Sequence, residues 1–191
     1  MAGRFDLIAF DVDGTLLDSE KNLRPEVAEA VKRASDSRVE VVLSTGRSVA
    51  ELRPVVSGLP GVRYAVCTSG SFIYDFKEET ALASFPMQRD IVRRIVDASR
   101  LEDTMLQMMS RGRSVVTGDL IEHMADYGMA RYQKLYRKVC LRVPDVREYI
   151  LESGEPAEKI NMYHRDAPAR DRNFERVRDL RAEMVYSELT S

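Results

Sequence analysis

Strand-like and helix-like segments alternate along the first third of this chain, and no other feature limits its fold as strongly. Short segments rich in apolar and β-branched residues favour strands, and the stretches between them favour helices. The expected strands are residues 5–10, 39–43 and 64–68, and the expected helices are residues 24–35 and 48–57. A strand–helix–strand–helix–strand order implies a parallel sheet with right-handed crossovers. We therefore expect an α/β fold.

Two carboxylates, Asp11 and Asp13, stand directly behind the first expected strand, whose apolar residues predict that it is buried. Side chains alternate along a strand, so both can leave on the same side, and Gly14 allows a sharp turn after them. Asp and Gly also favour ordinary turns, but ligands of open α/β sheets bind beyond the carboxyl ends of the strands, where these residues would lie. Hard oxygen ligands suit Mg²⁺ together with a substrate phosphate. The segment therefore predicts metal-assisted phosphate chemistry.

A second polar segment, Ser44-Thr45-Gly46-Arg47, lies where the second strand ends and the next helix is about to begin. Hydroxyls and backbone N–H groups near a helix N-terminus favour a phosphate. Ser44 and Thr45 also suit a purely structural role as helix caps. Because neighbouring parallel strands end at one edge of a sheet, we expect this segment to lie beside Asp11 and Asp13.

Bulk composition excludes several classes of protein. The 191 residues are 44% hydrophobic and 31% charged, which fits a globular protein with a buried core. A net charge of −2 gives no broad basic field for nucleic acid or an anionic membrane. No apolar run approaches the length of a membrane span, and the first residues lack a signal-type segment. We expect a cytoplasmic protein without nucleic-acid or membrane partners.

The pattern changes after Gly70. Residues 71–75 and 80–85 flank a polar turn and predict a β-hairpin. Beyond it we expect a second, α+β module. Its helices are expected at 90–100, at 119–137 as one or two helices, after Pro144 and at 170–183, and its strands at 104–109, 114–117, 139–143, 159–164 and 185–189.

Two motifs, Asp-Val-Asp-Gly-Thr-Leu-Leu-Asp at 11–18 and Ser-Thr-Gly-Arg at 44–47, closely resemble the haloacid dehalogenase (HAD) superfamily. Within it, the chain resembles the Cof-like phosphatases with a type IIB cap. The resemblance implies a HAD-like Rossmannoid parallel sheet with an inserted α+β cap domain. Residues 1–85 would be the N-terminal half of the core with the hairpin, and residues 86–191 the cap, ending near the return to the core.

The resemblance also implies roles for the first carboxylates. Asp11 would attack the phosphoryl group to form an aspartyl-phosphate. Asp13 would protonate the leaving oxygen and later activate water. Mg²⁺ would be held by Asp11 and by the backbone carbonyl of Asp13. The implied activity is Mg²⁺-dependent hydrolysis of a phosphate monoester, with a sugar phosphate or another small phosphorylated metabolite as the class of substrate.

The second motif would bind the phosphate and its surroundings. Thr45 and the Gly46 N–H would contact phosphate oxygens, and Ser44 is the third phosphate-binding candidate of the same segment. Arg47 would contact the substrate or the cap, and an ordinary surface salt bridge is the alternative for it.

The family needs two further elements after the cap, a lysine and an acidic loop, and neither has a convincing match here. Gly118-Asp119-Leu120-Ile121-Glu122 is the candidate loop, but Lys77 is the only lysine between Thr45 and Asp119. A helix N-terminus capped by Asp119 explains the segment better.

We therefore expect the chain to stop before the C-terminal half of the core and its activity to be impaired. The first strand would then present an open edge that could self-associate. One alternative is a compact capless phosphatase that completes its metal site with Asp119 and Glu122. The other is a degenerate Mg²⁺- or phosphate-binding or regulatory protein.

Overall fold

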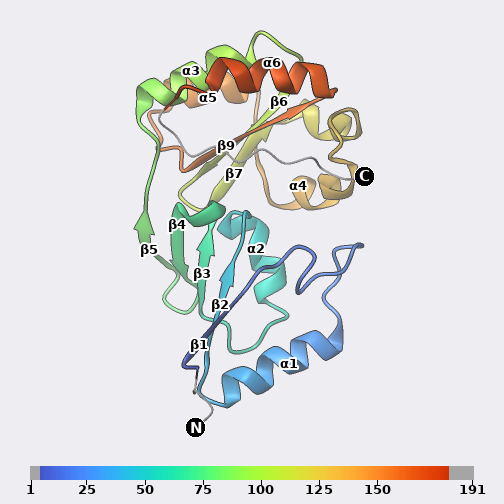
Figure 1. The fold of residues 1–191 in the computed structure, drawn as a ribbon, viewed down its shortest axis with the longest axis vertical. Helices are drawn as coiled ribbons and strands as arrows, with labels where there is room; N and C mark the ends of the chain where they lie inside the picture. Colours follow the sequence, from blue (N-terminus) through green and yellow to red (C-terminus); the bar gives the residue numbers. More distant parts are fainter. Residues whose placement is uncertain (1–4, 181–191) are drawn as a thin grey trace. The chain divides into compact units, whose positions relative to one another are not determined.

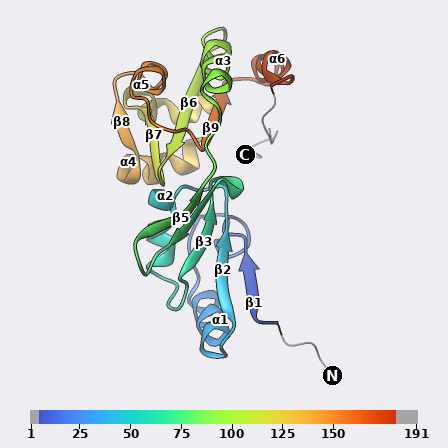
Figure 2. The ribbon, with the colours of Figure 1, turned by 90° about the vertical axis from the view of Figure 1, so that its left-hand side faces the viewer.

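The computed structural model describes residues 5–180 and divides into two compact units, Met1–Phe85 and Pro86–Ser191. Each unit has a β-sheet of its own (Figures 1 and 2). The boundary lies between Phe85 and Pro86. The interpretation of the units as core and cap stays a prediction.

The first unit confirms the expected alternation and the expected hairpin. Its sheet has the order β1-β2-β3-β4-β5, in which β1, β2 and β3 run parallel and β4 and β5 form the antiparallel hairpin. The elements are β1 (Leu7–Phe10), α1 (Pro25–Asp36), β2 (Glu40–Ser44), α2 (Val49–Val56), β3 (Tyr64–Cys67), η1 (Thr68–Gly70), β4 (Phe72–Asp75) and β5 (Thr80–Ser84).

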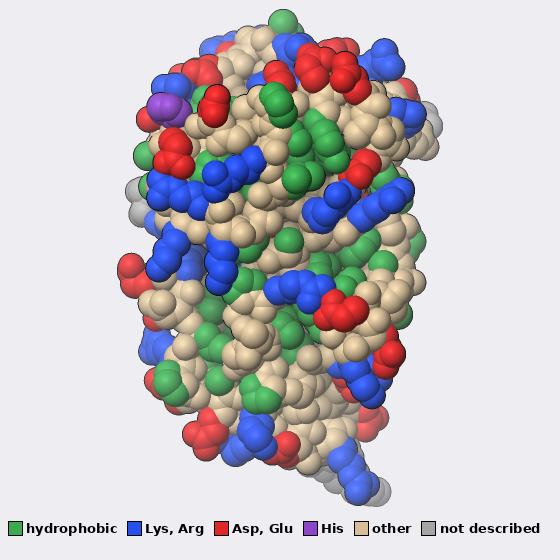
Figure 3. All heavy atoms as spheres, turned by 180° about the vertical axis from the view of Figure 1, so that it is seen from behind, with side chains coloured by type: hydrophobic (Ala, Val, Ile, Leu, Met, Phe, Trp, Pro, Cys, Tyr) green, Lys and Arg blue, Asp and Glu red, His purple; other side chains and the backbone are tan. Residues whose placement is uncertain are grey.

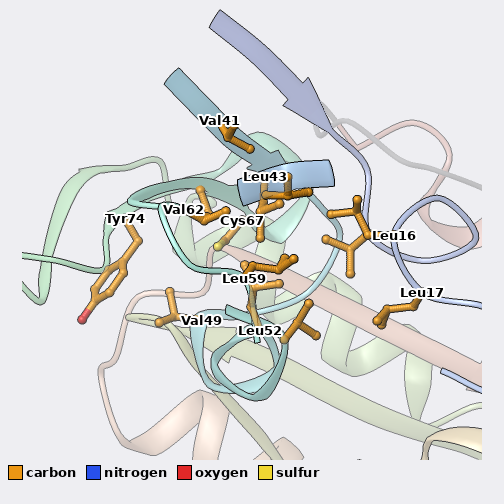
Figure 4. Packing of buried hydrophobic residues seen from close by; sticks show 14 of the residues in the cluster. Leu16, Leu17, Val41, Leu43, Val49, Leu52, Leu59, Val62, Cys67 and Tyr74 are labelled. Carbon is orange, nitrogen blue, oxygen red and sulfur yellow. The ribbon is translucent and has the colours of Figure 1, made fainter. Parts of the chain in front are cut away.

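The hydrophobic core of this unit lies against one face of the sheet, because the order β1-β2-β3 with right-handed crossovers places α1 and α2 on the same side. Val31 of α1, Leu43 of β2 and Leu52 of α2 are at most 2% exposed and belong to one cluster. Figure 4 shows Leu43 and Leu52 with Leu16 and Leu17 of the segment after β1.

The expectation of a buried first strand is wrong. Exposure alternates along β1, with Leu7 53% exposed and Ile8 and Phe10 half-buried. Within residues 5–180, β1 pairs with β2 alone and forms one margin of its sheet (Figure 2). Phe10 is on the face of the sheet that packs against α1 and α2, whereas Leu7 is on the opposite face and is exposed.

The second unit is the expected α+β module, with the sheet order β8-β7-β6-β9. Its elements are α3 (Arg89–Ser99), β6 (Thr104–Ser110), β7 (Arg113–Thr117), η2 (Asp119–Tyr127), η3 (Ala130–Tyr132), α4 (Gln133–Val139), β8 (Leu141–Val143), α5 (Val146–Glu152), β9 (Lys159–His164) and α6 (Ala167–Val177). The expected strand at 185–189 lies outside the described residues.

The segment 119–137, where one or two helices are expected, forms two 3₁₀ helices followed by α4. Gly128, in the left-handed conformation, ends η2. The N-cap of η2 is Gly118, and no side chain caps it, so the prediction that Asp119 caps this helix is wrong. Asp119 instead stands in the first turn, where its negative charge suits the helix dipole.

Helices cover both faces of the second sheet. Leu106 and Met108 of β6 pack with α3 and α5, whereas Met105, on the opposite face, packs with η2 and α4. Figure 1 shows α3, α5 and α6 on one side of this sheet and α4 on the other. Gln107 of β6 is fully buried, and its side-chain oxygen accepts hydrogen bonds from two tyrosines and an asparagine.

The surface carries charges of both signs. Acidic side chains are interspersed among basic ones on the face drawn in Figure 3. Within the described part of the chain, no helix is long and apolar enough to cross a membrane.

Candidate functional site

Polar residues follow the carboxyl ends of β1, β2 and β3. Because Phe10 pairs with Leu43 in the parallel register, Asp11 and Ser44 are the next residues on neighbouring strands. Asp11 is exposed, and the Thr15 hydroxyl lies 3.4 Å from its Oδ2. Gly14 has a φ of 86°, so the turn expected after the two carboxylates is present.

Arg47 holds the Asp13 carboxylate through two hydrogen bonds. Its Nε donates to Oδ2 at 2.8 Å and its Nη2 donates to Oδ1 at 2.7 Å. Nη1 donates to the Glu51 carbonyl at 3.3 Å, which ties the guanidinium to α2. The Arg47 residue is only 8% exposed. The interpretation of Arg47 as an ordinary surface salt bridge is therefore wrong, because the Arg47 side chain is buried and the pair joins the segments that follow β1 and β2.

A second cation, Lys21, also reaches Asp13, and the sequence did not single it out. Its Nζ lies 2.9 Å from Asp13 Oδ1. The preceding loop is shaped by Asp18, whose Oδ1 accepts the backbone N–H groups of Glu20 and Asn22 at 3.0 and 2.9 Å. This turn brings Lys21 back over the strand end. Asp18 is the last residue of the motif at 11–18. A polar turn centred on Asp18 is the one sequence signal that the loop folds back toward Asp13.

The environment of Asp13 favours its charged form. Burial raises the pKa of this carboxyl. The hydrogen bonds and charges of Arg47 and Lys21 lower it by more than burial raises it, so the pKa of Asp13 lies below its ordinary value. Asp13 is therefore an ionised carboxylate at neutral pH in this structure.

The segment from Ser44 to Ser48 joins β2 to α2. Ser48, not Ser44 or Thr45, is the N-cap of α2, and it forms a capping box with Glu51. The predicted capping role of Ser44 and Thr45 is therefore wrong. Ser44 and Gly46 are exposed, whereas Thr45 is buried and its Oγ1 accepts the Arg47 N–H at 3.2 Å.

The loop after β3 packs on this segment. Thr68 N–H donates to the Arg47 carbonyl at 2.9 Å, and Ser69 N–H donates to the Thr45 carbonyl at 3.0 Å. Both residues have a positive φ, 50° and 57°, which is unusual for residues other than Gly, above all for a β-branched Thr. The structure thus brings the ends of β1, β2 and β3 together, as expected from the parallel sheet.

The residues present fit Mg²⁺ in part. The exposed Asp11 carboxylate is open to a hard cation, which prefers one or two carboxylates completed by water and substrate phosphate. The Asp13 carboxylate, by contrast, is engaged at both oxygens by Arg47 and Lys21. Among residues 5–180, no group of three or more His, Cys, Asp and Glu side chains forms a metal-binding cluster.

The alternative metal site at Asp119 and Glu122 is not supported. The Glu122 carboxylate is bound by Arg137, whose Nε donates to Oε1 at 3.0 Å while Nη2 contacts Oε2. Asp119 is exposed in the first turn of η2. The hypothesis of a compact capless phosphatase, which requires a metal site at Asp119 and Glu122, is therefore not supported.

Comparisons with known proteins give a consistent result. Residues 8–187 match the haloacid dehalogenase-like hydrolase family. Pyridoxal phosphate phosphatase YbhA of Escherichia coli (strain K12) is 36% identical over 81 residues, or 42% of this chain and 30% of that protein. The 5-amino-6-(5-phospho-D-ribitylamino)uracil phosphatase YcsE of Bacillus subtilis (strain 168) is 39% identical over 69 residues, or 36% of this chain and 28% of that protein. The matched regions are thus less than a third of these relatives' lengths.

Solved structures share the fold. A haloacid dehalogenase-like hydrolase from B. subtilis aligns with a TM-score of 0.76 at 17% identity, over 92% of this chain and 67% of that one. The HAD subclass IIB sugar phosphatase BT4131 aligns with a TM-score of 0.67 at 14% identity, over 91% of this chain and 64% of that one. The predicted HAD-like α/β fold is therefore confirmed.

Proposed function

This chain belongs to the haloacid dehalogenase-like hydrolases, and we propose that it hydrolyses phosphate monoesters of small metabolites through Asp11. The observation that carries the proposal is the meeting of three polar segments at one edge of the sheet. The parallel register places Asp11 beside Ser44, and Ser69 binds the Thr45 backbone. Ligands of open α/β sheets bind at such an edge.

In the proposed reaction, a carboxylate oxygen of Asp11 attacks phosphorus and the bond to the leaving oxygen breaks. The leaving oxygen takes a proton from Asp13, which must therefore hold one at that moment. Water then attacks the aspartyl-phosphate and gives its proton to Asp13, so that inorganic phosphate leaves and Asp11 is restored. Mg²⁺, held by the Asp11 carboxylate and the Asp13 backbone carbonyl, would neutralise phosphate charge.

The segment after β2 is the proposed phosphate cradle. Thr45 and the Gly46 N–H would donate to phosphate oxygens, and the exposed Ser44 hydroxyl lies next to them in the chain. Backbone N–H groups at the start of a helix favour an anion, and α2 begins a few residues later at Val49. Arg47 is better placed to orient Asp13 than to contact the substrate, because Asp13 and the Glu51 carbonyl already engage its guanidinium.

The relatives support the proposed class of substrate. The two curated relatives are named as phosphatases of pyridoxal phosphate and of a phosphoribitylamino-uracil. We extend to this chain only their shared chemistry, a small phosphorylated metabolite such as a sugar phosphate. The second unit is the proposed cap, which would contact the part of the substrate beyond the phosphate.

The test is phosphate release from a panel of phosphomonoesters, with and without Mg²⁺. Wild type is expected to turn over in Mg²⁺, and Asp11→Asn is expected to lose turnover by several orders of magnitude because the nucleophile is gone. Asp36→Asn is the matched control, since Asp36 is an exposed residue of α1 paired with Lys32. An Asp11→Asn variant that retains wild-type turnover would refute the nucleophile.

One observation favours a second candidate function, a Mg²⁺- or phosphate-binding protein without turnover. Both oxygens of Asp13 are engaged by cations, and its pKa is lowered, so the resting site holds no proton donor there. Inorganic phosphate that binds tightly in Mg²⁺, with no hydrolysis of any ester on the panel, would select this function.

A further inference from the structure

We propose that Lys21 is a catalytic residue of this site, whose ammonium group leaves Asp13 for the substrate phosphate when substrate binds. The proposal rests on the phosphatase function proposed above and adds to it a residue that neutralises phosphate charge. It begins from the observation that Asp13 has two cationic partners although one of them, Arg47, already engages both carboxylate oxygens.

The two partners are not equivalent. Arg47 is fixed, because its side chain is 9% exposed, binds Asp13 at both oxygens and also donates to the Glu51 carbonyl. The Lys21 side chain is 21% exposed, it binds Asp13 through a single ammonium group, and its charge is carried at the end of a flexible four-carbon stem. Of the two contacts, the one made by Lys21 is therefore the one that a substrate can exchange.

The loop delivers Lys21 to this place and holds its backbone there. Leu16 and Leu17 are at most 5% exposed in the core, and Leu17 forms single bridges to Asp13 and Leu23. Lys21 has a φ of 63°, a left-handed conformation that costs a side-chain-bearing residue about 1 kcal/mol. The Asp18 turn imposes this conformation, since the Lys21 N–H donates to the Asp18 carbonyl at 3.0 Å. The ammonium group can move while the backbone stays.

Charge chemistry identifies the phosphate as the new partner. Asp13 stays neutralised by Arg47 when Lys21 departs, so the exchange leaves no unpaired buried carboxylate. A phosphate carries more negative charge and more acceptor oxygens than a carboxylate, and Lys binds it as a point charge. The departure also leaves Asp13 Oδ1 with one donor fewer, because the Arg47 Nη2 remains bound to it.

Lys21 is also the lysine that the fold places at this edge of the first unit. The sequence of this unit has two others, Lys32 and Lys77. Lys32 is on α1 and pairs with Asp36 at 2.5 Å, and Lys77 stands in the turn between β4 and β5. A cation supplied by the first unit's lysines to a phosphate at Asp11 would therefore come from Lys21.

The test compares wild type with Lys21→Met, Lys21→Cys and the matched control Lys32→Met. Two quantities are measured in Mg²⁺, the kinetic constants on the best ester of the panel and the affinity for inorganic phosphate by titration calorimetry. Lys21→Met is expected to lower kcat/KM by about a hundredfold or more, as for loss of one transition-state donor. Phosphate affinity is expected to fall about tenfold, and Lys32→Met is expected to match wild type.

Treating Lys21→Cys with 2-bromoethylamine restores an ammonium group at the same reach. Recovery of turnover and of phosphate affinity would support the proposal, because a merely structural role would not depend on charge. Wild type treated in the same way controls for reaction at the native cysteines, of which Cys67 is buried.

The outcomes separate the two proposals. Wild-type turnover with unchanged constants in Lys21→Met would overturn the role of Lys21 and leave the phosphatase intact. Loss in Lys21→Cys that aminoethylation does not restore, with thermal unfolding shifted by the same amount in all Lys21 variants, would also overturn it. A wild-type chain that neither hydrolyses any ester nor binds phosphate would refute the phosphatase, and the role of Lys21 with it.

Discussion

Arg47→Met tests whether the strand ends are held together by the pair with Asp13. The substitution keeps an unbranched apolar side chain of similar length and removes the guanidinium. The substitution removes two hydrogen bonds to the Asp13 carboxylate and one to the Glu51 carbonyl, among other contacts. Asp13 keeps Lys21 as its remaining cation.

The magnitude follows from the burial of the pair. Breaking a buried pair by removing one partner costs about 3 to 5 kcal/mol, whereas an exposed pair contributes about 0.2 to 1 kcal/mol. The Arg47 side chain is 9% exposed and that of Asp13 is 28% exposed, so the pair lies nearer to the buried limit. Because Lys21 still compensates the carboxylate, we expect the free energy of unfolding to fall by about 3 kcal/mol, the lower end of the buried range.

The assay is urea-induced unfolding followed by far-ultraviolet circular dichroism, since the chain has no Trp. Arg33→Met is the control, because Arg33 forms an exposed pair with Glu29 on α1, and it is expected to lose less than about 0.5 kcal/mol. A double-mutant cycle with Asp13→Asn is expected to give a coupling energy of about 2 kcal/mol. A coupling energy no larger than that of the control pair would refute the reasoning.

Three other predictions concern separate parts of the molecule. Arg63 holds the pKa of Asp75 at about 2, so this pair stabilises the fold fully above the pKa of Asp75 in the unfolded chain, and the stabilisation is lost as pH falls toward 2. Asp75→Asn should therefore make the free energy of unfolding less dependent on pH in the acid range. An unchanged dependence on pH would contradict this. Gln107→Met removes the acceptor of three side-chain donors at a fully buried position, so the free energy of unfolding in urea should fall by about 3 kcal/mol. An unchanged free energy of unfolding would show that these three donors find other acceptors. We expect wild type to self-associate through the β1 edge and Leu7→Lys to reduce this in sedimentation velocity, and equal sedimentation of both proteins would exclude that edge.

The order of elements and the position of the polar segments were determined by the sequence alone. The alternation of strands and helices predicted the parallel part of the first sheet, and the position of Asp11 and Ser44 behind neighbouring strands predicted that they meet. These predictions succeed because the residue patterns of strands and helices extend over only a few neighbouring residues. Parallel strands with right-handed crossovers also end at the same edge of the sheet for any conformation of their loops. The hairpin at β4 and β5 was likewise readable from its polar turn.

Only the tertiary structure decided how the charges of the site pair. Arg47 lies 34 residues from Asp13, and nothing in its neighbourhood in the sequence distinguishes a buried partner of Asp13 from a surface arginine. Lys21 reaches the same carboxylate because the Asp18 turn folds the loop back, and a pattern of residue types does not report the direction of a loop. The chemistry of Asp13 depends on both contacts, since the pKa of a carboxyl responds to charges a few ångströms away, and those distances exist only once the chain has folded.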